Sequence, residues 1–403
     1  MLLSIKVCDR TMLRIPITDY SVCNALGRTQ QDVLQAMARE QSGLTPCRYP
    51  LPFSTYAGAI DGSFDALPEH IGSWDSRALR LAYHLLQSMQ TSYRDMMARW
   101  APERVAVIIG TSTAGIDNTE QAYAEMVEGG ELPADYDIWK HHAYGAVLDM
   151  LREVTGAQGP AWVVSTACTS SAKTVASAAR LMEAGLIDAA IVGGVDTLCD
   201  MTLRGFHALS ALSTERTRPF SSAREGINIG EGGALLLLER EGHAKAYVRG
   251  IGESSDAYHI AAPHPEGLGA QLAMSRALES AQLPADAIDF INAHGTGTRL
   301  NDAMESRAIA DTFPHTPPVF STKGWTGHAL GGAGANEIAL TLLSLQHGLL
   351  PPSLGADPVD ESLEVQVLRV TQRGNYRYAL SNSFAFGGNN ISVLLEAAEG
   401  DNG

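Results

Sequence analysis

Short apolar runs alternate with longer helical stretches along most of this 403-residue chain, from about Arg104 onward. This alternation is typical of an α/β protein, because strands that are buried on both faces of a sheet read as continuous apolar runs. The sequence therefore predicts the α/β fold class. We predict strands at 105–109, 161–164, 189–192, 234–238, 288–293, 318–322, 363–370, 378–383 and 391–397, and helices at 91–99, 170–183, 269–281, 302–311 and 335–347.

A charged segment, residues 239–250, separates two similar series of strands and helices. Strands in both series end in turns rich in Gly and Thr, at 108–115 and 291–298. We therefore predict two units, residues 1–245 and 246–403, and a duplicated architecture is consistent with this pattern. Two stretches without clear periodicity, 111–145 and 196–232, are expected to be long excursions, a common place for pocket walls and partner contacts.

Composition and charge exclude several classes of function. The formal net charge of −16 argues against nucleic acid as a partner, because the phosphate backbone requires a basic surface. The 5 cysteines include no CxxC pair, which argues against a disulfide framework or a zinc site and favours a reducing compartment. No apolar run approaches membrane-spanning length. We therefore expect a soluble, cytoplasmic protein with no membrane insertion.

Cys168 lies where a short strand, Ala161–Val164, runs into small residues and then into an alanine-rich helix. At the N-terminus of a helix, free N–H groups and the helix dipole stabilise a thiolate, the reactive form of cysteine. Apolar residues at 172, 175, 176, 179 and 182 have the spacing of one buried helix face. A cysteine that packs as a small hydrophobic residue is the plainer interpretation, and it is the commoner one for an arbitrary cysteine.

Two histidines favour a catalytic role for Cys168 over a packing role. His294 follows a predicted strand and opens the turn HGTGT, and His328 lies in a glycine-dense stretch before a predicted helix. Glycines beside a histidine allow a ligand or another backbone to approach closely. We predict no metal site, because neither histidine belongs to an HxxxH or HxH pair. A cysteine with two such histidines instead indicates nucleophilic catalysis with two hydrogen-bond donors.

Five motifs together resemble a known family, the β-ketoacyl-acyl-carrier-protein synthases that carry a Cys-His-His triad. The resemblance runs from about Pro16 to Leu395 and implies a thiolase-like fold, with duplicated αβαβα layered halves and mixed five-stranded sheets. The nucleophile Cys168 would then lie in the N-terminal half and both histidines in the C-terminal half. The motifs are STACTSS (165–171), RPFSSAREGINIGEGG (218–233), NAHGTGTRLND (292–302), KGWTGHALGGAG (323–334) and SNSFAFGGNN (381–390).

The resemblance implies a decarboxylative Claisen condensation, an acyltransferase reaction of fatty acid or type II polyketide or polyene elongation. Cys168 would hold an acyl chain, and the backbone N–H groups of Cys168 and Phe386 would form the oxyanion hole. Neutral His294 and His328 would donate hydrogen bonds to a malonyl thioester on carrier protein. By the same match, Lys323 would be a charged group beside the histidines.

Other residues match supporting positions of the family. Glu337 would be the carboxylate partner of the lysine, and Thr296 and Thr298 would bind the pantetheine arm of the carrier. Turn stabilisation is an equally good interpretation of the two threonines. Thr113 matches a position whose bulk limits the acyl pocket, so a small residue there would accept a longer or rigid chain. In the gating loop, Ala385 stands where relatives commonly have Gly, which could stiffen the hinge.

The resemblance also implies partners: an acyl carrier protein that delivers substrate on 4′-phosphopantetheine, with no bound cofactor, and a dimer. The dimer could be a homodimer or a heterodimer with a related ketosynthase or chain-length subunit. Ser210 stands where many relatives have a basic residue for the carrier, so Arg204, Arg77 or Arg80 could serve instead. For any one of these arginines, a solvated surface role is the commoner interpretation.

Two alternatives stay open beside an active elongating ketosynthase. A thiolase would condense without decarboxylation, but it would place a second catalytic cysteine near the C-terminus, and SNSFAFGG (381–388) contains none. A chain-length partner subunit would have lost the nucleophile, whereas Cys168 is present. The sequence does not fix the acyl-chain length, the pathway, the carrier or the identity of the second subunit.

Overall fold

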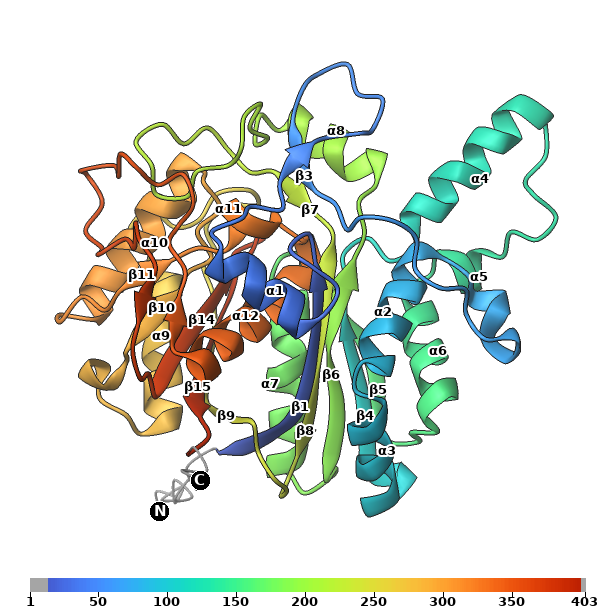
Figure 1. Cartoon of the computed structure of the whole chain (residues 1–403), viewed down its shortest axis with the longest axis horizontal. Coiled ribbons are helices and arrows are strands. Elements are labelled where there is room, and N and C mark those ends of the chain that lie inside the picture. The colour runs from blue at the N-terminus through green and yellow to red at the C-terminus, as the bar shows by residue number, and fades with distance from the viewer. Residues whose placement is uncertain (1–13, 400–403) are drawn as a thin grey trace, which may run out of the picture.

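Ten strands form one continuous sheet in the computed structural model of the chain, which describes residues 14–399 (Figure 1). Cys8 lies outside the described residues. The sheet joins two sets of five strands where β1 pairs antiparallel with β9 over only three residues, Ile15–Ile17. Its order is β5 (Ala161–Val164), β4 (Val105–Gly110), β6 (Ala189–Asp196), β8 (Gly232–Glu239), β1 (Ile15–Asn24), β9 (Ala246–Ser255), β15 (Asn389–Ala397), β14 (Tyr378–Phe384), β10 (Phe290–Asn292) and β11 (Val319–Phe320).

The two sets of strands have the same pattern of directions. In the first, β5, β4 and β6 run parallel, and β8 and β1 continue antiparallel. In the second, β11, β10 and β14 run parallel, and β15 and β9 continue antiparallel. Each set is therefore a mixed five-stranded unit, as expected for a duplicated thiolase-like fold.

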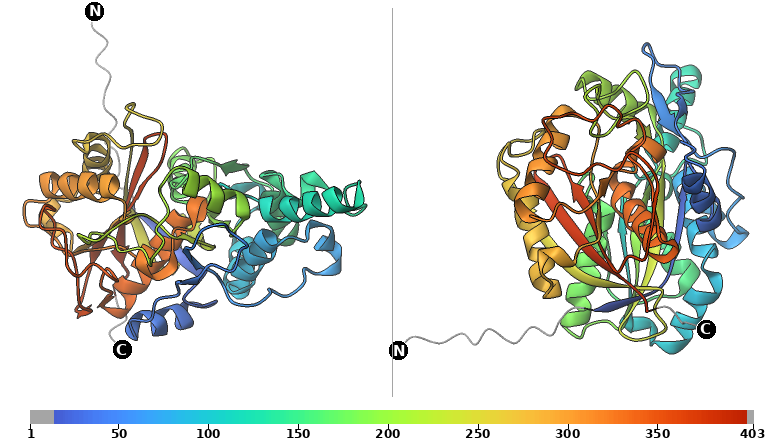
Figure 2. Two further views of the ribbon diagram at one scale, coloured as in Figure 1. Left: turned by 90° about the horizontal axis from the view of Figure 1, so that it is seen from above. Right: turned by 60° about the vertical axis from the view of Figure 1, so that its left-hand side comes forward.

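Helices lie in three layers around the two sets of strands (Figures 1 and 2). The middle layer, between the two sets, holds the helix that follows Cys168 and the helix that follows His328. This five-layer order confirms the predicted fold class. The middle layer is α7 (Ser170–Glu183) and α12 (Ala333–His347), one outer layer is α2 (Arg77–Gln87), α3 (Gln90–Arg99) and α6 (Gly145–Thr155), and the other is α9 (Leu268–Ala281) and α10 (Arg299–Thr312).

Shorter elements lie at the edges of this framework, and α4 projects away from the body of the molecule (Figure 1). They include two small sheets, of three and two strands. The remaining elements are β2 (Thr45–Pro46), β3 (Tyr56–Gly58), β7 (Ile229–Gly230), β12 (Leu349–Leu350), β13 (Gln372–Arg373), α1 (Gln30–Ala38), α4 (Ile116–Gly129), α5 (Ile138–His141), α8 (Asp200–Ala208), α11 (Lys323–Thr326), and the 3-10 helices η1 (Glu69–Trp74), η2 (Pro102–Arg104), η3 (Ala285–Ala287) and η4 (Leu330–Gly332).

Small residues let the middle layer approach the sheet closely. A Cβ added to Gly110, at the end of β4, would lie 2.3 Å from the backbone nitrogen of Ser171. A Cβ on Gly194 in β6 would lie 2.1 Å from the carbonyl oxygen of Gly110. The buried face of α7 is itself rich in alanine, at positions such as Ala172 and Ala176. These contacts fix the start of α7, and with it Cys168, against the ends of two strands.

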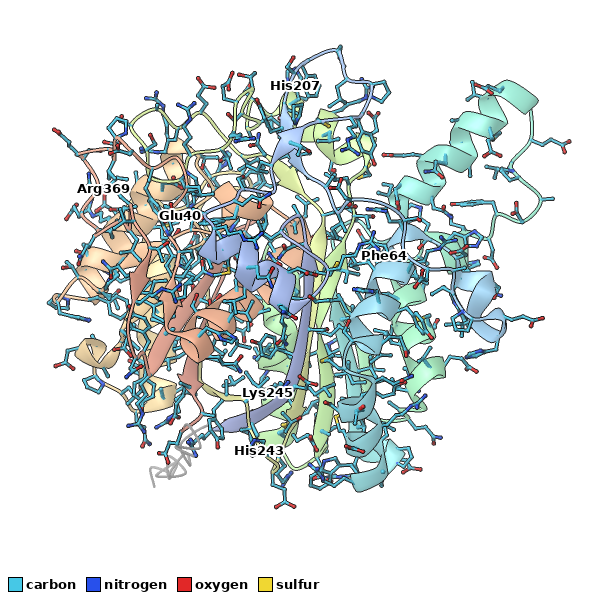
Figure 3. All side chains as sticks on the ribbon, viewed as in Figure 1. Glu40, Phe64, His207, His243, Lys245 and Arg369 are labelled. Atoms are coloured by element: carbon cyan, nitrogen blue, oxygen red, sulfur yellow. The ribbon has the colours of Figure 1, made fainter. Side chains whose placement is uncertain are left out.

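Two ion pairs and a contact between a cation and an aromatic ring hold α2 and β1 in place, and Figure 3 labels two of the side chains that take part, Lys245 and Phe64. Lys245 Nζ lies 2.5 Å from Asp19 Oδ1 and so joins the turn before β9 to β1. Arg77 of α2 forms an ion pair with the buried Glu231, with Nη2 and Oε1 2.6 Å apart. The guanidinium of Arg77 also lies 5.3 Å from the ring centroid of Phe64. The side chain of Arg77 therefore joins α2 to the buried Glu231 and to the ring of Phe64.

One strand prediction was wrong, and two other segments contain elements that were not predicted. Residues 363–370 form no strand and make one isolated bridge, Val319 to Val367. Their alternating apolar residues lie in a loop and pack against the hydrophobic cluster formed by residues of α9, β10 and β14. Residues 111–145 contain the helix Ile116–Gly129, whose exposed apolar residues hid its periodicity. The charged segment 239–250 includes the end of β8 and the first half of β9, and only Arg240, Glu241 and Lys245 of its charged residues lie in the turn between them.

No helix within residues 14–399 is long and apolar enough to span a lipid bilayer.

The contact at Gly110 predicts a matched pair of stability changes. We expect Gly110→Ala to lower the free energy of unfolding by about 1–3 kcal/mol, because the new methyl group must displace backbone. The control is Gly205→Ala in the exposed helix α8, where an added Cβ meets nothing within 4 Å. We expect that variant to gain about 0.5–1 kcal/mol. Urea unfolding followed by circular dichroism measures both, and equal stabilities would contradict the proposed packing.

Candidate active site

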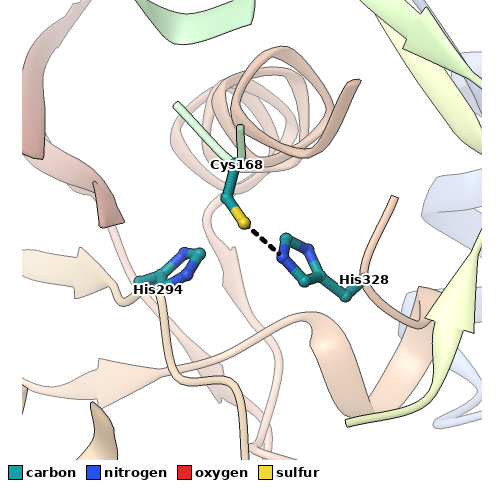
Figure 4. A group of neighbouring side chains, drawn as sticks. All are labelled: Cys168, His294 and His328. Carbon is teal, nitrogen blue, oxygen red and sulfur yellow. Dashed lines mark hydrogen bonds between the residues drawn. The ribbon is translucent and has the colours of Figure 1, made fainter. Parts of the chain in front are cut away.

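Cys168 lies between the end of β5 and the start of α7, with its side chain almost fully buried. The residue before it, Ala167, has φ of +53°, a left-handed conformation that costs energy for a residue with a Cβ. Ser170 holds this turn, because its N–H and its hydroxyl both donate to the Ala167 carbonyl, at 3.0 and 2.6 Å. The sulfur that follows this sharp turn points toward the two histidines (Figure 4).

Two imidazoles flank the sulfur. His328 Nε2 lies 2.9 Å from Cys168 Sγ, and the ring of His294 lies on the other side (Figure 4). The ring centroids of the two histidines are 5.5 Å apart, with an interplanar angle of 83°. His294 follows β10, whereas His328 lies between α11 and η4. The structure therefore brings together three residues that lie on separate segments of the chain, as the sequence predicted.

Lys323 and Glu337 form a buried ion pair directly behind His294. Lys323 Nζ lies 3.2 Å from His294 Nδ1 and donates to the His294 carbonyl oxygen at 2.5 Å. An ammonium group can only donate, so Nδ1 of His294 must accept. The proton of the neutral ring is then on Nε2. The lysine thus fixes the tautomer of His294.

Burial keeps both histidines uncharged. Desolvation lowers the pKa of His294 well below its ordinary value, and the positive charge of Lys323 and then His328 lower it further. Desolvation and then Lys323 lower the pKa of His328 in the same way. Burial also raises the pKa of Glu337 to about 7, against the opposing effect of Lys323. Near neutral pH the two imidazoles are therefore neutral, as two hydrogen-bond donors require.

The expectation of a stabilised thiolate at Cys168 was wrong for the resting protein. Burial raises the pKa of the Cys168 thiol to about 12, and this effect exceeds the lowering by Lys323 and by the backbone N–H groups of Cys168 and Phe386. Desolvation of the sulfur therefore outweighs the helix N-terminus and the nearby ammonium group. Cys168 is a thiol until a reaction partner changes its surroundings.

A cavity of about 370 Å³ leads to the sulfur. Cys168 and His328 line its inner end, and Thr296, Thr298 and Phe386 line its walls. The hydroxyls of the two threonines are 2.8 Å apart, and Thr298 is also the N-cap of α10, where it accepts from the Asn301 N–H. The turn-stabilising interpretation therefore describes Thr298, and the place of both threonines in the cavity wall leaves their contact with the pantetheine arm a prediction.

Thr113 does not reach this cavity. It is buried, and its N–H and hydroxyl both donate to Asp196. Its side chain thus stabilises the turn after β4 and is absent from the cavity wall around Cys168.

The loop after β14 places a backbone donor beside the sulfur. The N–H of Phe386 interacts with Cys168, and the exposed Phe386 ring lies 6.0 Å from that of Phe206, on α8. Gly387 and Gly388 follow with φ of +82° and +75°. The torsional freedom of this loop therefore resides in the two glycines, which begin two residues after Ala385, and the alanine does not by itself remove the hinge.

The three arginines considered for the carrier already have carboxylate partners. Arg204 pairs with Asp200, and Arg80 pairs with Asp75. Arg77 holds the buried Glu231. Arg299, which was not identified from the sequence, is exposed and lines the cavity beside Thr298. Its position directly after the motif HGTGT was the signal that could have identified it.

Glu305 was also missed, although it supports the loop that carries His294. Its carboxylate accepts from the backbone N–H groups of His294 and Gly295 at 2.8 and 2.7 Å. Burial raises its pKa to about 7, and those two hydrogen bonds oppose the rise. Asp302 and Glu305 stand three residues apart, on one face of α10, directly after the histidine motif. That spacing was the available signal.

The ligand atoms of Cys168, His294 and His328 lie within 4.8 Å of one another, a spacing that could admit a metal ion. Two features oppose such a site. The ammonium group of Lys323 lies beside His294, and a buried positive charge repels a divalent cation. The sulfur is also held as a thiol, whereas a metal requires the thiolate. The donor set fits proton and acyl transfer better than metal binding.

Comparisons with known proteins agree with this geometry. Residues 22–244 match the family described as Beta-ketoacyl synthase, N-terminal domain, and residues 245–357 match Beta-ketoacyl synthase, C-terminal domain. The chain belongs to the beta-ketoacyl synthase family. It is accordingly an enzyme of the acyltransferase class, which confirms the resemblance seen in the five motifs.

Relatives of known function and structure resemble nearly the whole chain of this ketoacyl synthase. It is 31% identical to the 3-oxoacyl-[acyl-carrier-protein] synthase 2 of Vibrio harveyi, over 95% of this chain and 98% of that protein. A chain of the solved complex of the ketosynthase ApeO with its chain length factor ApeC from Xenorhabdus doucetiae is 39% identical with a TM-score of 0.90, over 96% of this chain and 98% of that one. The ishigamide ketosynthase/chain length factor is 25% identical with a TM-score of 0.87, over 96% and 100%.

The raised pKa of Cys168 predicts how its reactivity depends on pH. We expect the rate of alkylation by iodoacetamide to rise about tenfold per pH unit up to about pH 9, because the thiolate fraction grows until the pH reaches the pKa. Mass spectrometry of the Cys168 peptide measures this rate, with the half-buried Cys47 as an internal reference. A plateau at or below neutral pH would mean that the resting sulfur is already ionised.

Proposed function

We propose that this chain catalyses the decarboxylative condensation of an acyl group on Cys168 with a malonyl group carried by acyl carrier protein. The observation that supports this most directly is the position of Cys168 Sγ, 2.9 Å from His328 Nε2 and beside His294, at the inner end of a cavity. A nucleophile next to two neutral hydrogen-bond donors suits acyl transfer followed by formation of an enolate.

In the first half-reaction, the sulfur of Cys168 attacks the carbonyl carbon of an acyl thioester on the carrier. The carbon–sulfur bond to the carrier breaks, and the carrier leaves as a thiol with the proton that Cys168 gives up. The N–H groups of Cys168 and Phe386, which already act on the sulfur, would stabilise the oxyanion that forms in between. No net proton is gained or lost in this step.

In the second half-reaction, His294 and His328 donate to the thioester carbonyl of the malonyl group. The bond to its carboxylate breaks, carbon dioxide leaves, and the electron pair forms an enolate. The enolate carbon attacks the acyl carbonyl on Cys168, and the carbon–sulfur bond to Cys168 breaks. The released thiolate takes a proton from solvent. Lys323 supports this step because it holds the donor proton of His294 on Nε2.

A chain-length subunit and a thiolase are less well supported. Cys168 and both histidines are present and lie together, which a subunit without catalytic function would not need. The loop that approaches the sulfur, residues 381–390, carries no second cysteine for the chemistry of a thiolase.

We further propose a heterodimer with a chain-length-factor subunit, in a type II polyketide or polyene pathway. The solved structures with chains that are 39% and 25% identical both name a ketosynthase together with a chain length factor. Among residues 14–399, β5 is the last strand at its edge of the sheet. Large apolar side chains are exposed on β5, on α5 and on α4, the helix that projects from the body of the molecule (Figure 1). Exposed apolar surface of this kind marks an interface. These side chains are Tyr123, Val127, Ile138, Trp139 and Trp162.

The carrier would deliver its substrates on 4′-phosphopantetheine through the cavity. Thr296 and Thr298 line its wall, where hydroxyls can bind the amides of the arm. Arg299 lines the cavity too and is exposed, and the outer end of the arm carries a phosphate. A guanidinium group binds phosphate in a bidentate manner, so we propose that Arg299 contacts it.

Variants of the three central residues test the proposed reaction. We expect Cys168→Ala to abolish both the acyl-enzyme and condensation, because no other group is placed to hold the acyl chain. We expect His294→Ala and His328→Ala to slow malonyl decarboxylation by about 10²–10⁴-fold, the usual cost of losing one donor to a developing oxyanion. Intact-protein mass spectrometry measures the acyl-enzyme, and release of labelled carbon dioxide measures decarboxylation.

Cys47→Ala is the matched control, because this cysteine is only half-buried and lies outside the cavity wall. We expect it to react as the wild type does. Condensation by Cys168→Ala, or decarboxylation at the wild-type rate in both histidine variants, would refute the proposed function.

Arg299→Ala tests the contact with the arm. We expect the KM for malonyl-carrier protein to rise about three- to tenfold with kcat unchanged, and Arg299→Lys to recover part of the loss. Arg276→Ala is the control, because Arg276 is also exposed but lies on α9, outside the cavity wall. Malonyl-pantetheine without the phosphate should show no difference between wild type and Arg299→Ala. An unchanged KM for the carrier substrate would contradict the contact.

A further inference from the structure

Asp196, the last residue of β6, is a buried carboxylate with an unusual number of hydrogen bonds. Oδ1 accepts from the hydroxyls of Thr111 and Thr113 at 2.5 and 2.8 Å, and from the N–H groups of Ser112 and Thr113 at 3.0 and 2.9 Å. Oδ2 accepts from the N–H groups of Ser112 and Gly331 at 2.9 and 2.6 Å. All these donors are neutral groups. A buried charge is tolerated only when such contacts satisfy it, so each of them matters energetically.

The donors belong to two separate segments, each of which leads to a reacting side chain. The first segment, residues 111–113, supports the nucleophile: Ser112 Oγ donates to the carbonyl oxygen of Ala167 at 3.2 Å, and Cys168 follows directly. The second segment contains Gly331, three residues after His328. Asp196 thus joins the segment that supports Cys168 to the segment that carries His328.

The packing between these segments leaves no spare room. A Cβ on Gly331 would lie 2.6 Å from the Ser112 nitrogen and 2.7 Å from Asp196 Oδ2. The adjacent Leu330 has φ of +48°, a strained conformation that the surrounding contacts must hold in place. The two segments are therefore in close contact at Asp196 and Gly331.

We propose that Asp196 is a positioning residue that sets the distance between the sulfur of Cys168 and the imidazole of His328. This inference rests on the proposed function, but its test measures the alkylation rate of Cys168 and does not require condensation activity. Asp196→Asn keeps the shape of the side chain and replaces one acceptor oxygen with an NH₂ group, which faces N–H or O–H donors and cannot accept from them.

The experiment measures alkylation of Cys168 by iodoacetamide as a function of pH in a double-mutant cycle. We expect Asp196→Asn to slow alkylation about fivefold or more and to change its pH dependence, because the sulfur loses its contact with His328. In a His328→Ala background, where that contact is already absent, the same substitution should change the rate less than about 1.5-fold. Equal losses in both backgrounds would show a general structural role and overturn the proposal.

Two further variants keep the result interpretable. Gly331→Ala leaves the carboxylate intact but separates the same two segments, and it should reproduce the slower alkylation. Asp289→Asn is the control, because Asp289 also accepts from two backbone N–H groups, those of Arg377 and Tyr378. It lies before β10, at the opposite end of that strand from His294, and should alkylate at the wild-type rate. Wild-type rates and pH profiles in both Asp196→Asn and Gly331→Ala would refute the proposal.

A condensation assay on the same variants separates the role of Asp196 from the proposed function. We expect kcat to fall about tenfold or more in Asp196→Asn, with KM for the carrier substrate within about twofold of wild type. A drop in kcat without the change in alkylation would place the effect of Asp196 elsewhere and overturn the proposal. Failure of the wild type to condense any substrate would overturn the proposed function, whereas the alkylation cycle would still decide the role of Asp196.

Discussion

Exclusion of water around two imidazoles is the constraint on which the rest of the site depends. His294 and His328 stay neutral because burial penalises their charged forms, and the adjacent Lys323 adds to the penalty. The lysine can itself be buried only because Glu337 and the carbonyl oxygen of His294 satisfy it. The neutral histidine rings therefore depend on the buried ion pair and on the tight packing of the middle helices. Water that reached any of these groups would weaken the burial of the others.

The topology explains why residues so far apart in the sequence meet. The first and second sets of strands place their parallel strands in the same relation to α7 and α12, and side chains at the ends of those strands converge between the two helices. Cys168 comes from one set and His294 from the other. His328 lies in the segment before α12, and α12 contacts both sets of strands. A cavity that opens at this junction is a consequence of the duplication itself.

The sequence predicted the fold class and the grouping of Cys168, His294 and His328, because each lies in a motif at the end of a strand or before a helix. Lys323 and Glu337 could be placed only by the family resemblance, and the boundary near residue 245 stays a prediction. Residue patterns did not reveal Asp196, whose partners lie 84 and 135 positions away. Nor could they give the pKa of Cys168, since the helix N-terminus is visible in the sequence but the desolvation that outweighs it is a property of the packed structure.

The two histidines differ in how firmly their protons are fixed, and this difference suits the two half-reactions. Lys323 holds the proton of His294 on Nε2, so that nitrogen can only donate. Nδ1 of His328 has no hydrogen-bond partner among residues 14–399, and no contact there selects one tautomer. A thiol with a raised pKa must lose its proton as it attacks, and the nearest acceptor is His328 Nε2. The malonyl step then requires a proton on that same nitrogen. A ring free to change its tautomer can accept in the first step and donate in the second, whereas a second lysine at Nδ1 would have allowed only the second.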